Sequence, residues 1–312
     1  MHSKSQFPKL KSLAILSPMS GVTDVAFRAL AKKYGAGLTY TEFTSSAALV
    51  RKNSSALKKI AVSKFESPVA VQLFGNNIDE VIGAAKIVQD EFDIIDINCG
   101  CPAWKVIKGG SGSEMLKEPN KIASFVNKLV SSTNKPITVK IRAGIDERHI
   151  NAVEIAKLVQ DAGAAAIAIH GRTQKQGYSG NADWNIIKSV KNAVDIPVIG
   201  NGDVFTPQQF KEKLDFSGVD YIMIARGAIG NPFIFEQIND YLKNGTYEKE
   251  DRIKLFFEYL KLAKEYGISF EQIKTHAMSF TKTLRAGSVI RANMISCKCT
   301  DEICSLLLKK SE

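Results

Sequence analysis

Eight short runs of β-branched and other apolar residues recur along this chain, and amphipathic stretches lie between them. The runs cover 13–18, 38–43, 69–74, 94–98, 137–142, 165–170, 197–201 and 220–225. The intervening helical patterns include 24–34, 78–91, 119–130, 151–162 and 184–193. Eight strand–helix units within about 230 residues match the count and length of a (β/α)8 barrel, or TIM barrel. The sequence therefore predicts an α/β fold of this kind.

Alternating strands and helices also occur in a doubly wound open sheet. That fold needs fewer strands and normally has one glycine-rich turn after the first of them. No such fingerprint follows 13–18, so the barrel is favoured.

The strand pattern stops near Asn244, and the rest of the chain has helical periodicity at 251–266, 271–284 and 288–308. The cluster Lys243-Asn244-Gly245-Thr246 is a natural boundary. We therefore predict a barrel catalytic domain, 1–243, followed by a small all-α domain, 244–312.

The formal net charge of +10 favours an acidic partner. Five cations and no acid lie between Gln272 and Thr300, namely Lys274, Lys282, Arg285, Arg291 and Lys298. A stretch of one sign is either a phosphate-contacting surface or a solvated helix face.

Composition and segment lengths indicate an ordinary cytoplasmic protein, with 45% hydrophobic and 24% charged residues. No apolar run is long enough to span a membrane, and 1–12 does not have the pattern of a signal peptide. Five cysteines in a chain of this length do not form a disulfide framework. Cys297 and Cys304 are seven apart on one expected helical face, with Cys299 between them. These three thiols lack a fourth partner and no two histidines have metal-ligand spacing, so we predict no metal site.

Polar or glycine-containing groups occur at almost every predicted strand end. The active site of a TIM barrel lies at the carboxyl ends of its strands, so these groups should converge there. Any one of them could simply be loop polarity. The set comprises Pro18, Met19, Ser20, Glu42, Gln72, Asn98, Cys99, Gly100, Cys101, Lys140, Arg142, His170, Asn201, Gly202, Asp203, Ala225, Arg226 and Gly227.

Strand alternation places Lys140 and Arg142 opposite Val139 and Ile141, and so in the barrel mouth. A cation there needs an anion, which is either a bound ligand or a carboxylate such as Asp96. His170 is either structural or a ligand contact. The loops after the last two strands are where barrels commonly bind phosphate.

The run Asn98-Cys99-Gly100-Cys101-Pro102 presents a thiol at the end of the fourth strand. Cys101 lies further past the strand and should project into the mouth, whereas Cys99 should be packed. The alternatives are a buried structural thiol or half of a metal pair. Nearby Lys105 and Lys108 would favour a thiolate or hold a polyanion.

Seven segments in this order resemble the tRNA-dihydrouridine synthase family across about 13–241. They are PMSGVTD at 18–24, VQLFG at 71–75, DINCGCP at 96–102, VKIR at 139–142, HGRT at 170–173, GNGD at 200–203 and ARGA at 225–228. The helical tail is similar to that family's RNA-binding domain.

The resemblance implies an FMN enzyme that uses NADPH or NADH to reduce the C5–C6 double bond of particular uridines in tRNA. Hydride would pass from flavin N5 to C6, and Cys101 would be the general acid at C5, which requires a neutral thiol in place of the thiolate. The expected flavin contacts are Pro18, Met19, Ser20, Gln72, Lys140, His170, Asn201, Gly202, Asp203, Ala225 and Arg226. The expected substrate or tRNA contacts are Asn98, Lys105, Lys108, Arg142, Arg172, Lys282, Arg285 and Arg291, together with Glu42 and Tyr178.

The target uracil would be extruded from the folded RNA into the pocket. We expect a monomer that has no obligate protein partner and does not associate with a membrane. Two other functions remain open at this stage, a flavin barrel acting on a small molecule and a non-catalytic RNA-binding protein.

Overall fold

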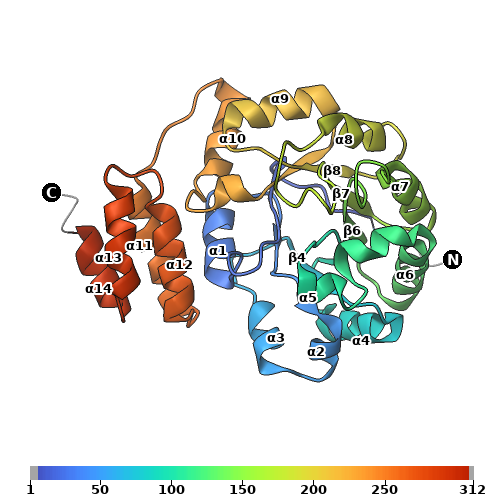
Figure 1. Cartoon of the computed structure of the whole chain (residues 1–312), viewed down its shortest axis with the longest axis horizontal. Coiled ribbons are helices and arrows are strands. Elements are labelled where there is room, and N and C mark those ends of the chain that lie inside the picture. The colour runs from blue at the N-terminus through green and yellow to red at the C-terminus, as the bar shows by residue number, and fades with distance from the viewer. Residues whose placement is uncertain (1–5, 309–312) are drawn as a thin grey trace.

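The computed structural model describes residues 6–308 and contains a parallel sheet of nine strands that curls into a barrel (Figure 1). The ladder runs β1-β9-β8-β7-β6-β5-β4-β2, and the short β3 pairs with β4. Leu16 N donates to Leu38 O (2.9 Å) and so links β1 to the segment that enters β2. The strands are β1 (Ala14–Leu16), β2 (Thr39–Tyr40), β3 (Thr44–Ser45), β4 (Val69–Phe74), β5 (Ile94–Cys99), β6 (Ile137–Arg142), β7 (Ala166–His170), β8 (Val198–Asn201) and β9 (Tyr221–Ile224).

The predicted (β/α)8 barrel is confirmed, and each of the eight predicted runs contains a strand. The second run, 38–43, forms only the two-residue β2. The separate β3 that follows was not predicted, because two residues are too short a run to show an alternating pattern.

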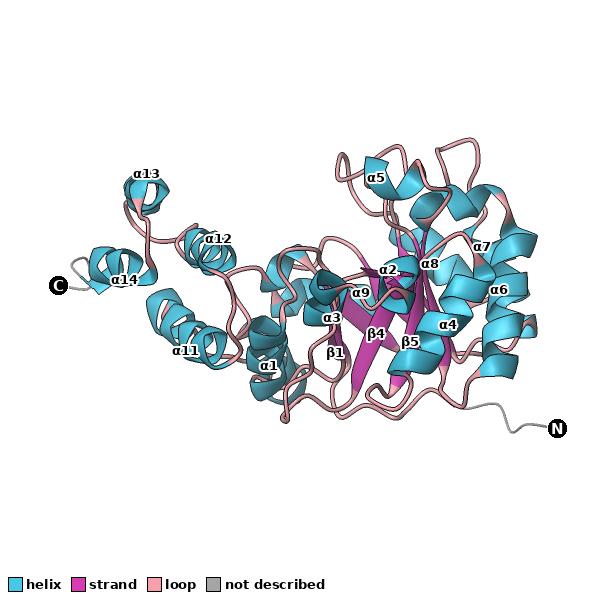
Figure 2. Cartoon of the chain, turned by 90° about the horizontal axis from the view of Figure 1, so that it is seen from below, coloured by secondary structure: helices cyan, strands magenta, loops and turns pink. Residues whose placement is uncertain are grey.

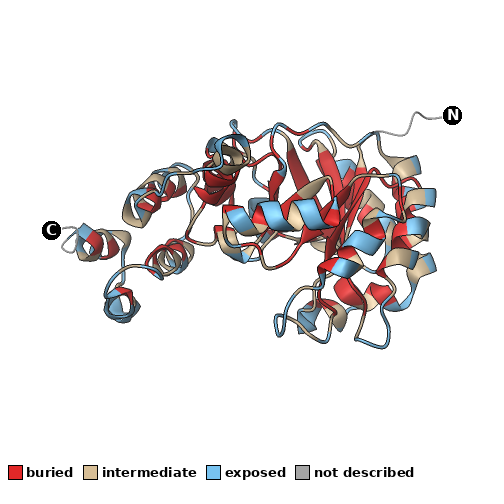
Figure 3. Ribbon diagram, turned by 90° about the horizontal axis from the view of Figure 1, so that it is seen from above, coloured by how far each residue is buried: buried red, intermediate tan, exposed pale blue. Residues whose placement is uncertain are grey.

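Helices surround the barrel, and their exposed faces point outward while the strands are buried (Figure 3). In chain order they are α1 (Val25–Lys33), α2 (Ser46–Val50), α3 (Ser54–Lys59), α4 (Ile78–Val88), α5 (Trp104–Ile107), α6 (Pro119–Ser132), α7 (Ala152–Asp161), α8 (Trp184–Lys191), α9 (Pro207–Ser217) and α10 (Ile234–Asn244). Two short 3₁₀ segments, Gly112–Lys117 and Arg226–Ala228, lie near the carboxyl ends of the strands.

The strands alternate between two buried layers. Val139 and Ile141 of β6 belong to the large apolar layer between strands and helices. Ala166 and Ala168 of β7 belong to a smaller cluster with Tyr40 and other residues inside the barrel. This alternation sends every second side chain inward, which is how polar groups near the strand ends reach the mouth.

Four helices form the tail beside α1 and α10 (Figure 1). They are α11 (Arg252–Glu265), α12 (Phe270–Phe280), α13 (Gly287–Ser296) and α14 (Thr300–Leu308). The expected single helix over 288–308 is wrong, because the backbone becomes extended at Cys297 (ψ 132°) and α13 ends there. Cys297 and Cys304 therefore do not share a helical face.

A buried polar cluster joins the tail to the barrel. The Asp24 carboxylate, at the start of α1, accepts hydrogen bonds from Tyr259 Oη (3.1 Å) and Gln272 Nε2 (3.2 Å), and lies 2.9 Å from His276 Nε2. His276 also stacks on Phe27, with ring centroids 5.1 Å apart. Specific polar and aromatic contacts thus fix α11 and α12 against α1.

No helix within residues 6–308 is both long enough and apolar enough to cross a membrane.

Candidate active site

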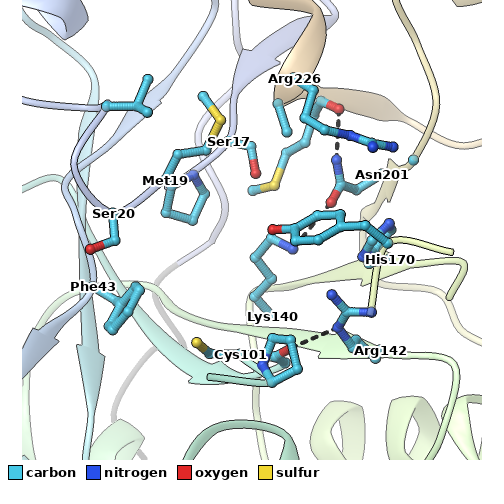
Figure 4. Close-up of a pocket in the computed structure, with 18 of the residues that line it drawn as sticks. Ser17, Met19, Ser20, Phe43, Cys101, Lys140, Arg142, His170, Asn201 and Arg226 are labelled. Atoms are coloured by element: carbon cyan, nitrogen blue, oxygen red, sulfur yellow. Dashed lines mark hydrogen bonds between the residues drawn. The ribbon is translucent and has the colours of Figure 1, made fainter. Parts of the chain in front are cut away.

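A cavity of about 520 Å³ opens at the carboxyl ends of the strands (Figure 4). Its volume lies in the range of small-molecule and cofactor sites. Lys140 extends toward Asn201, while Cys101 and Arg142 lie beneath it and Met19 and Ser20 form another wall (Figure 4). The cavity is lined by all eleven residues predicted to contact flavin, and by Asn98, Cys101 and Arg142.

The loop carrying Cys101 is held by backbone and side-chain hydrogen bonds. Asn98 Oδ1 accepts from the backbone N–H groups of Gly100 (3.1 Å) and Cys101 (2.9 Å). Ser113 N and Oγ both donate to Cys101 O, at 3.0 and 2.9 Å. Burial raises the pKa of the Cys101 thiol, although a backbone hydrogen bond and the charges of Arg142 and Lys140 oppose this. The site therefore favours the neutral thiol.

Cys99 is fully buried and belongs to the apolar layer between strands and helices. Its Sγ lies 3.8 Å from Met115 Sδ, and burial raises the pKa of its thiol. Cys101 is thus the thiol that the cavity presents.

Lys140 Nζ donates to Asn201 Oδ1 at 3.2 Å. The pKa of Lys140 is lowered to about 8, mainly by burial and also by the charge of Arg142, while Asp96 and Cys101 act in the opposite direction. The alternative of a direct ion pair with Asp96 is not found, since that carboxylate accepts from Gln72 Nε2 and Thr138 Oγ1. A cation held by an amide oxygen favours an electron-rich ligand in the cavity.

His170 is buried at the end of β7, and its pKa is lowered well below the usual histidine value. Burial is the main cause, and the charges of Lys140, Arg142, Arg172 and Arg226 add to it. The imidazole is therefore neutral at physiological pH and available as a hydrogen-bond partner rather than as a charge.

An arginine pair surrounds Asp203 beyond β8. Arg172 Nη1 and Arg226 Nη2 donate to the Asp203 carboxylate at 2.8 and 2.7 Å. Asp203 adopts a left-handed conformation (φ 50°), which is strained for a residue with a side chain. At the neighbouring Gly227, a Cβ would lie 2.3 Å from Val204 O, so only glycine permits this close backbone approach. The two arginines neutralise the Asp203 carboxylate, and the glycine leaves space at this corner for the anionic end of a ligand.

Arg172 does not line the cavity and is fully buried. Besides Asp203, its guanidinium donates to Ser179 O (3.1 Å) and Gly180 O. A fully buried Arg172 side chain does not fit a direct contact with RNA. Its position in the sequence did not show that the side chain turns inward. Arg172 instead fixes Asp203.

Arg142 lines the cavity but also ties loops together. Its Nε donates to Gly100 O (2.9 Å), and its Nη1 donates to Thr173 O (2.8 Å) and Gly177 O (2.9 Å). It therefore links the Cys101 loop to the loop after β7.

Two aromatic side chains of the cavity, Phe43 and Phe205, were not among the predicted site residues. Tyr178, an expected uracil or tRNA contact, also lines the cavity, and the Arg226 guanidinium lies 5.1 Å from its ring centre and 5.5 Å from that of Phe205. Only folding brings these loop residues to the mouth. Their one sequence signal is an aromatic residue within a few positions of a strand end.

The sequence comparisons place the chain in a family. A family model described as dihydrouridine synthase matches residues 15–310. This chain belongs to the dihydrouridine synthase family. It is 45% identical over 239 residues to a Rickettsia conorii protein named "Probable tRNA-dihydrouridine synthase", covering 76% of this chain and 72% of that one. It is 39% identical over 265 residues to tRNA-dihydrouridine synthase B of Shewanella oneidensis, covering 83% and 82%.

Solved structures with low sequence identity share the fold. The structure of TcOYE with pHBA matches with a TM-score of 0.55 and 12% identity, covering 85% of this chain and 97% of that chain. Histamine dehydrogenase from Rhizobium sp. 4-9 matches with a TM-score of 0.53 and 15% identity, covering 81% of this chain and 49% of that one.

The remaining predicted residues of this dihydrouridine synthase family member lie outside the cavity. Lys105 and Lys108 are exposed beside the Cys101 loop, and Lys282 and Arg285 are exposed between α12 and α13. Arg291 is half-buried and donates to Thr281 O (3.0 Å). α5 and α13 rise on the same side of the molecule (Figure 2). Among residues 6–308, no group of three or more His, Cys, Asp or Glu side chains could hold a metal ion.

Proposed function

We propose that this protein reduces the C5–C6 double bond of specific uridines in tRNA, with FMN as the resident cofactor and NADPH as the electron donor. One observation carries the proposal. A thiol that burial keeps neutral, that of Cys101, stands at a cavity whose other walls bear Lys140, Asn201 and Arg226. Family membership supplies the reaction class, and the relatives' names supply the tRNA substrate.

The cavity fits a flavin mononucleotide in size and in the distribution of its chemistry. Met19 and Val22 offer an apolar wall for a ring system, and Gln72, Lys140 and Asn201 offer hydrogen-bonding groups for its polar edge. At the corner formed by the loops after β8 and β9, Arg226 is about 40% exposed and would hold the phosphate. The bound flavin would supply the hydride that is added at C6 of the uracil.

Cys101 would deliver the proton to C5. Adding hydride to C6 leaves negative charge on C5 and on the O4 carbonyl, and the S–H bond then breaks as the C5–H bond forms. The resulting thiolate lies near Arg142 and Lys140, whose charges stabilise it until a solvent proton restores the thiol. NADPH would then return two electrons to the cofactor.

Basic groups around the mouth would hold the RNA. Lys105 and Lys108 lie next to the thiol loop, and Lys282 and Arg285 are exposed between α12 and α13. The neighbouring helices α5 and α13 rise on the same side of the molecule (Figure 2). Phosphate contacts at both places would orient the tRNA so that one extruded uracil reaches the cavity. We also propose that the chain works as a cytoplasmic monomer, with 1–243 as the catalytic domain and 244–312 as the tRNA-binding domain.

Replacing Cys101 with alanine tests the proposal directly. We expect Cys101→Ala to keep its bound flavin and its oxidation of NADPH, and to lose about 10²–10³ in the rate of dihydrouridine formation, because only proton delivery is removed. Dihydrouridine in tRNA from a deletion strain would be measured before and after incubation with the purified protein.

The matched control is Cys299→Ala, because that thiol is exposed and lies in the tail. Its rate should equal the wild-type rate. Wild-type protein that carries flavin yet reduces only free pyrimidines would contradict the tRNA substrate. Unchanged tRNA reduction in Cys101→Ala would contradict the proton-donor role alone.

A further inference from the structure

A chain of buried hydrogen bonds runs from Asp96 to the backbone of the Cys101 loop. Asp96 Oδ2 accepts from Gln72 Nε2 (2.7 Å), and Gln72 Oε1 accepts from Asn98 Nδ2 (2.8 Å). Asn98 Oδ1 then accepts from the N–H groups of Gly100 (3.1 Å) and Cys101 (2.9 Å). The side chains of Asp96, Gln72 and Asn98 are all buried.

The two ends of this chain fix the orientation of both amides between them. A carboxylate can only accept hydrogen bonds and a backbone N–H can only donate. Gln72 must therefore turn its NH₂ group toward Asp96, and Asn98 must turn its oxygen toward Cys101. If either amide flipped, two donors or two acceptors would face each other in a buried site, which is costly.

From this geometry we infer that Asp96 is a positioning residue, whose carboxylate sets Gln72 and Asn98 in the orientation that anchors the Cys101 loop. Asp96 touches neither the cavity nor the thiol, and it acts only through the two amides. The role in catalysis rests on the proposed function, whereas the anchoring of the loop does not.

The sheet register explains why this series of hydrogen bonds begins at Asp96. Gln72 of β4 and Thr138 of β6 are the direct cross-strand partners of Asp96 in β5. Thr138 Oγ1 donates to Asp96 Oδ1 at 2.5 Å, so each carboxylate oxygen has its own donor. The titratable groups that interact with Asp96 are Tyr40 of β2, Cys99 of β5 and Lys140 of β6.

Protonation of Asp96 should weaken the anchor. Burial raises the pKa of Asp96 to about 6, against the lowering effects of its hydrogen bonds with Thr138 and Gln72 and of the Lys140 charge. Above this pH the carboxylate accepts strongly from Gln72. Below it, the acid either donates in place of accepting or offers a weaker neutral carbonyl, so the loop should loosen as the pH falls through about 6.

Amide hydrogen exchange at Gly100 and Cys101, followed by NMR on the full chain without tRNA or NADPH, measures the anchor directly. In Asp96→Leu we expect these two amides to exchange at least tenfold faster at pH 7.5. Asp96→Asn should give intermediate protection that does not fall further as the pH passes through about 6, because its neutral oxygen still accepts from Gln72, more weakly than a carboxylate, and does not titrate. Wild-type protection of both amides in Asp96→Leu would overturn the inference.

Thr138→Val is the matched variant, and it also serves if Asp96→Leu does not fold. It removes a hydrogen bond to Asp96 but leaves the hydrogen bonds from Asp96 through Gln72 and Asn98 to Cys101 intact. The exchange rates at pH 7.5 should be unchanged, and the pH at which protection falls should rise by about one unit because the carboxylate is less stabilised.

The same shift should appear in the acid limb of kcat for tRNA reduction, with little change in KM. Asp96→Asn should have no acid limb from this group. A limb that stays in place in Thr138→Val, or that persists in Asp96→Asn, would refute the role of Asp96. A wild-type protein that reduces no tRNA would refute the proposed function and leave the exchange result standing.

Discussion

Trp104 is a large aromatic residue that stays exposed to solvent, and no contact of the barrel fold within residues 6–308 accounts for this exposure. It begins α5, three positions after Cys101, and is about 70% exposed, while Lys105 beside it is also exposed. Leaving an indole in water forgoes the gain that burial would give. A stacking partner supplied by the RNA would recover it, since bases stack on aromatic side chains regardless of their identity.

We therefore expect Trp104→Ala to raise the KM for tRNA about tenfold with little change in kcat, because one base-stacking contact contributes ~1–3 kcal/mol. Trp104→Phe should restore most of the affinity. The second tryptophan, Trp184, is buried and bonded to Gly202 O, so quenching of exposed indole fluorescence by tRNA should disappear in Trp104→Phe.

Phe216→Ala provides the control for exposed aromatic area. Phe216 is about 43% exposed at the end of α9, which leads into the amino-terminal end of β9 on the opposite side of the barrel from the cavity. Its KM for tRNA should match wild type. Equal KM values for Trp104→Ala and wild type would rule out stacking at Trp104.

At the scale of elements, the tail is joined to the barrel by contacts that cross from α11 and α12 to α1. The Asp24 carboxylate also accepts from Phe27 N at 2.9 Å, so one side chain both caps α1 and receives the groups from the tail. Removing one partner leaves buried polar atoms without hydrogen bonds, which costs ~1–3 kcal/mol.

His276→Ala should accordingly lower the free energy of unfolding by ~1–3 kcal/mol, because it removes both the hydrogen bond with Asp24 and the stacking on Phe27. Urea denaturation would measure the decrease. The KM for tRNA should rise, because the tail is held less firmly beside the cavity.

Thr275→Ala, at an exposed neighbouring position of α12, should change the unfolding free energy by less than ~0.5 kcal/mol. If His276→Ala were as stable as this control, the Asp24 cluster would not be what holds the tail.

At the scale of the whole molecule, the fold decides where the positive charges behind the net charge of +10 are exposed. Lys105 and Lys108 lie in and just after α5, and Lys282 and Arg285 lie between α12 and α13, and all four are exposed. α5 and α13 rise on the same side of the molecule (Figure 2). Lys274 belongs to the same one-signed stretch, but its Nζ donates to Ile295 O (2.6 Å) and Cys297 O (3.0 Å), which caps the end of α13. The stretch is thus part structural and part available to phosphates.

The double variant Lys282→Gln/Arg285→Gln should weaken tRNA binding and reduce the slope of log K against log salt by about 2, because each substitution removes one cation that would neutralise a phosphate. Binding measured across a series of salt concentrations gives this slope. Lys211→Gln/Lys213→Gln, on α9, is the control of equal charge change and should leave the slope unaltered. An unaltered slope in the tail variant would place the RNA elsewhere.

Much of the site was predictable because a barrel converts strand ends into neighbours. Gln72, Lys140 and Asn201 are far apart in sequence, but each ends or nearly ends a strand, so all were expected at one mouth and all line the cavity. Residues on the connecting loops followed no such rule. Arg172 turns inward to Asp203, and Tyr178 reaches the cavity from a loop whose course the periodicity does not specify.

The sequence by itself determined the number and order of strand–helix units, the family motifs and the choice of Cys101 over Cys99, since alternation and spacing are local properties of the chain. The tertiary structure decided which polar groups pair across strands. The chain from Asp96 through Gln72 and Asn98 exists only because register places β4 beside β5, and its polarity follows from burial, where an unpaired donor or acceptor is too costly to leave.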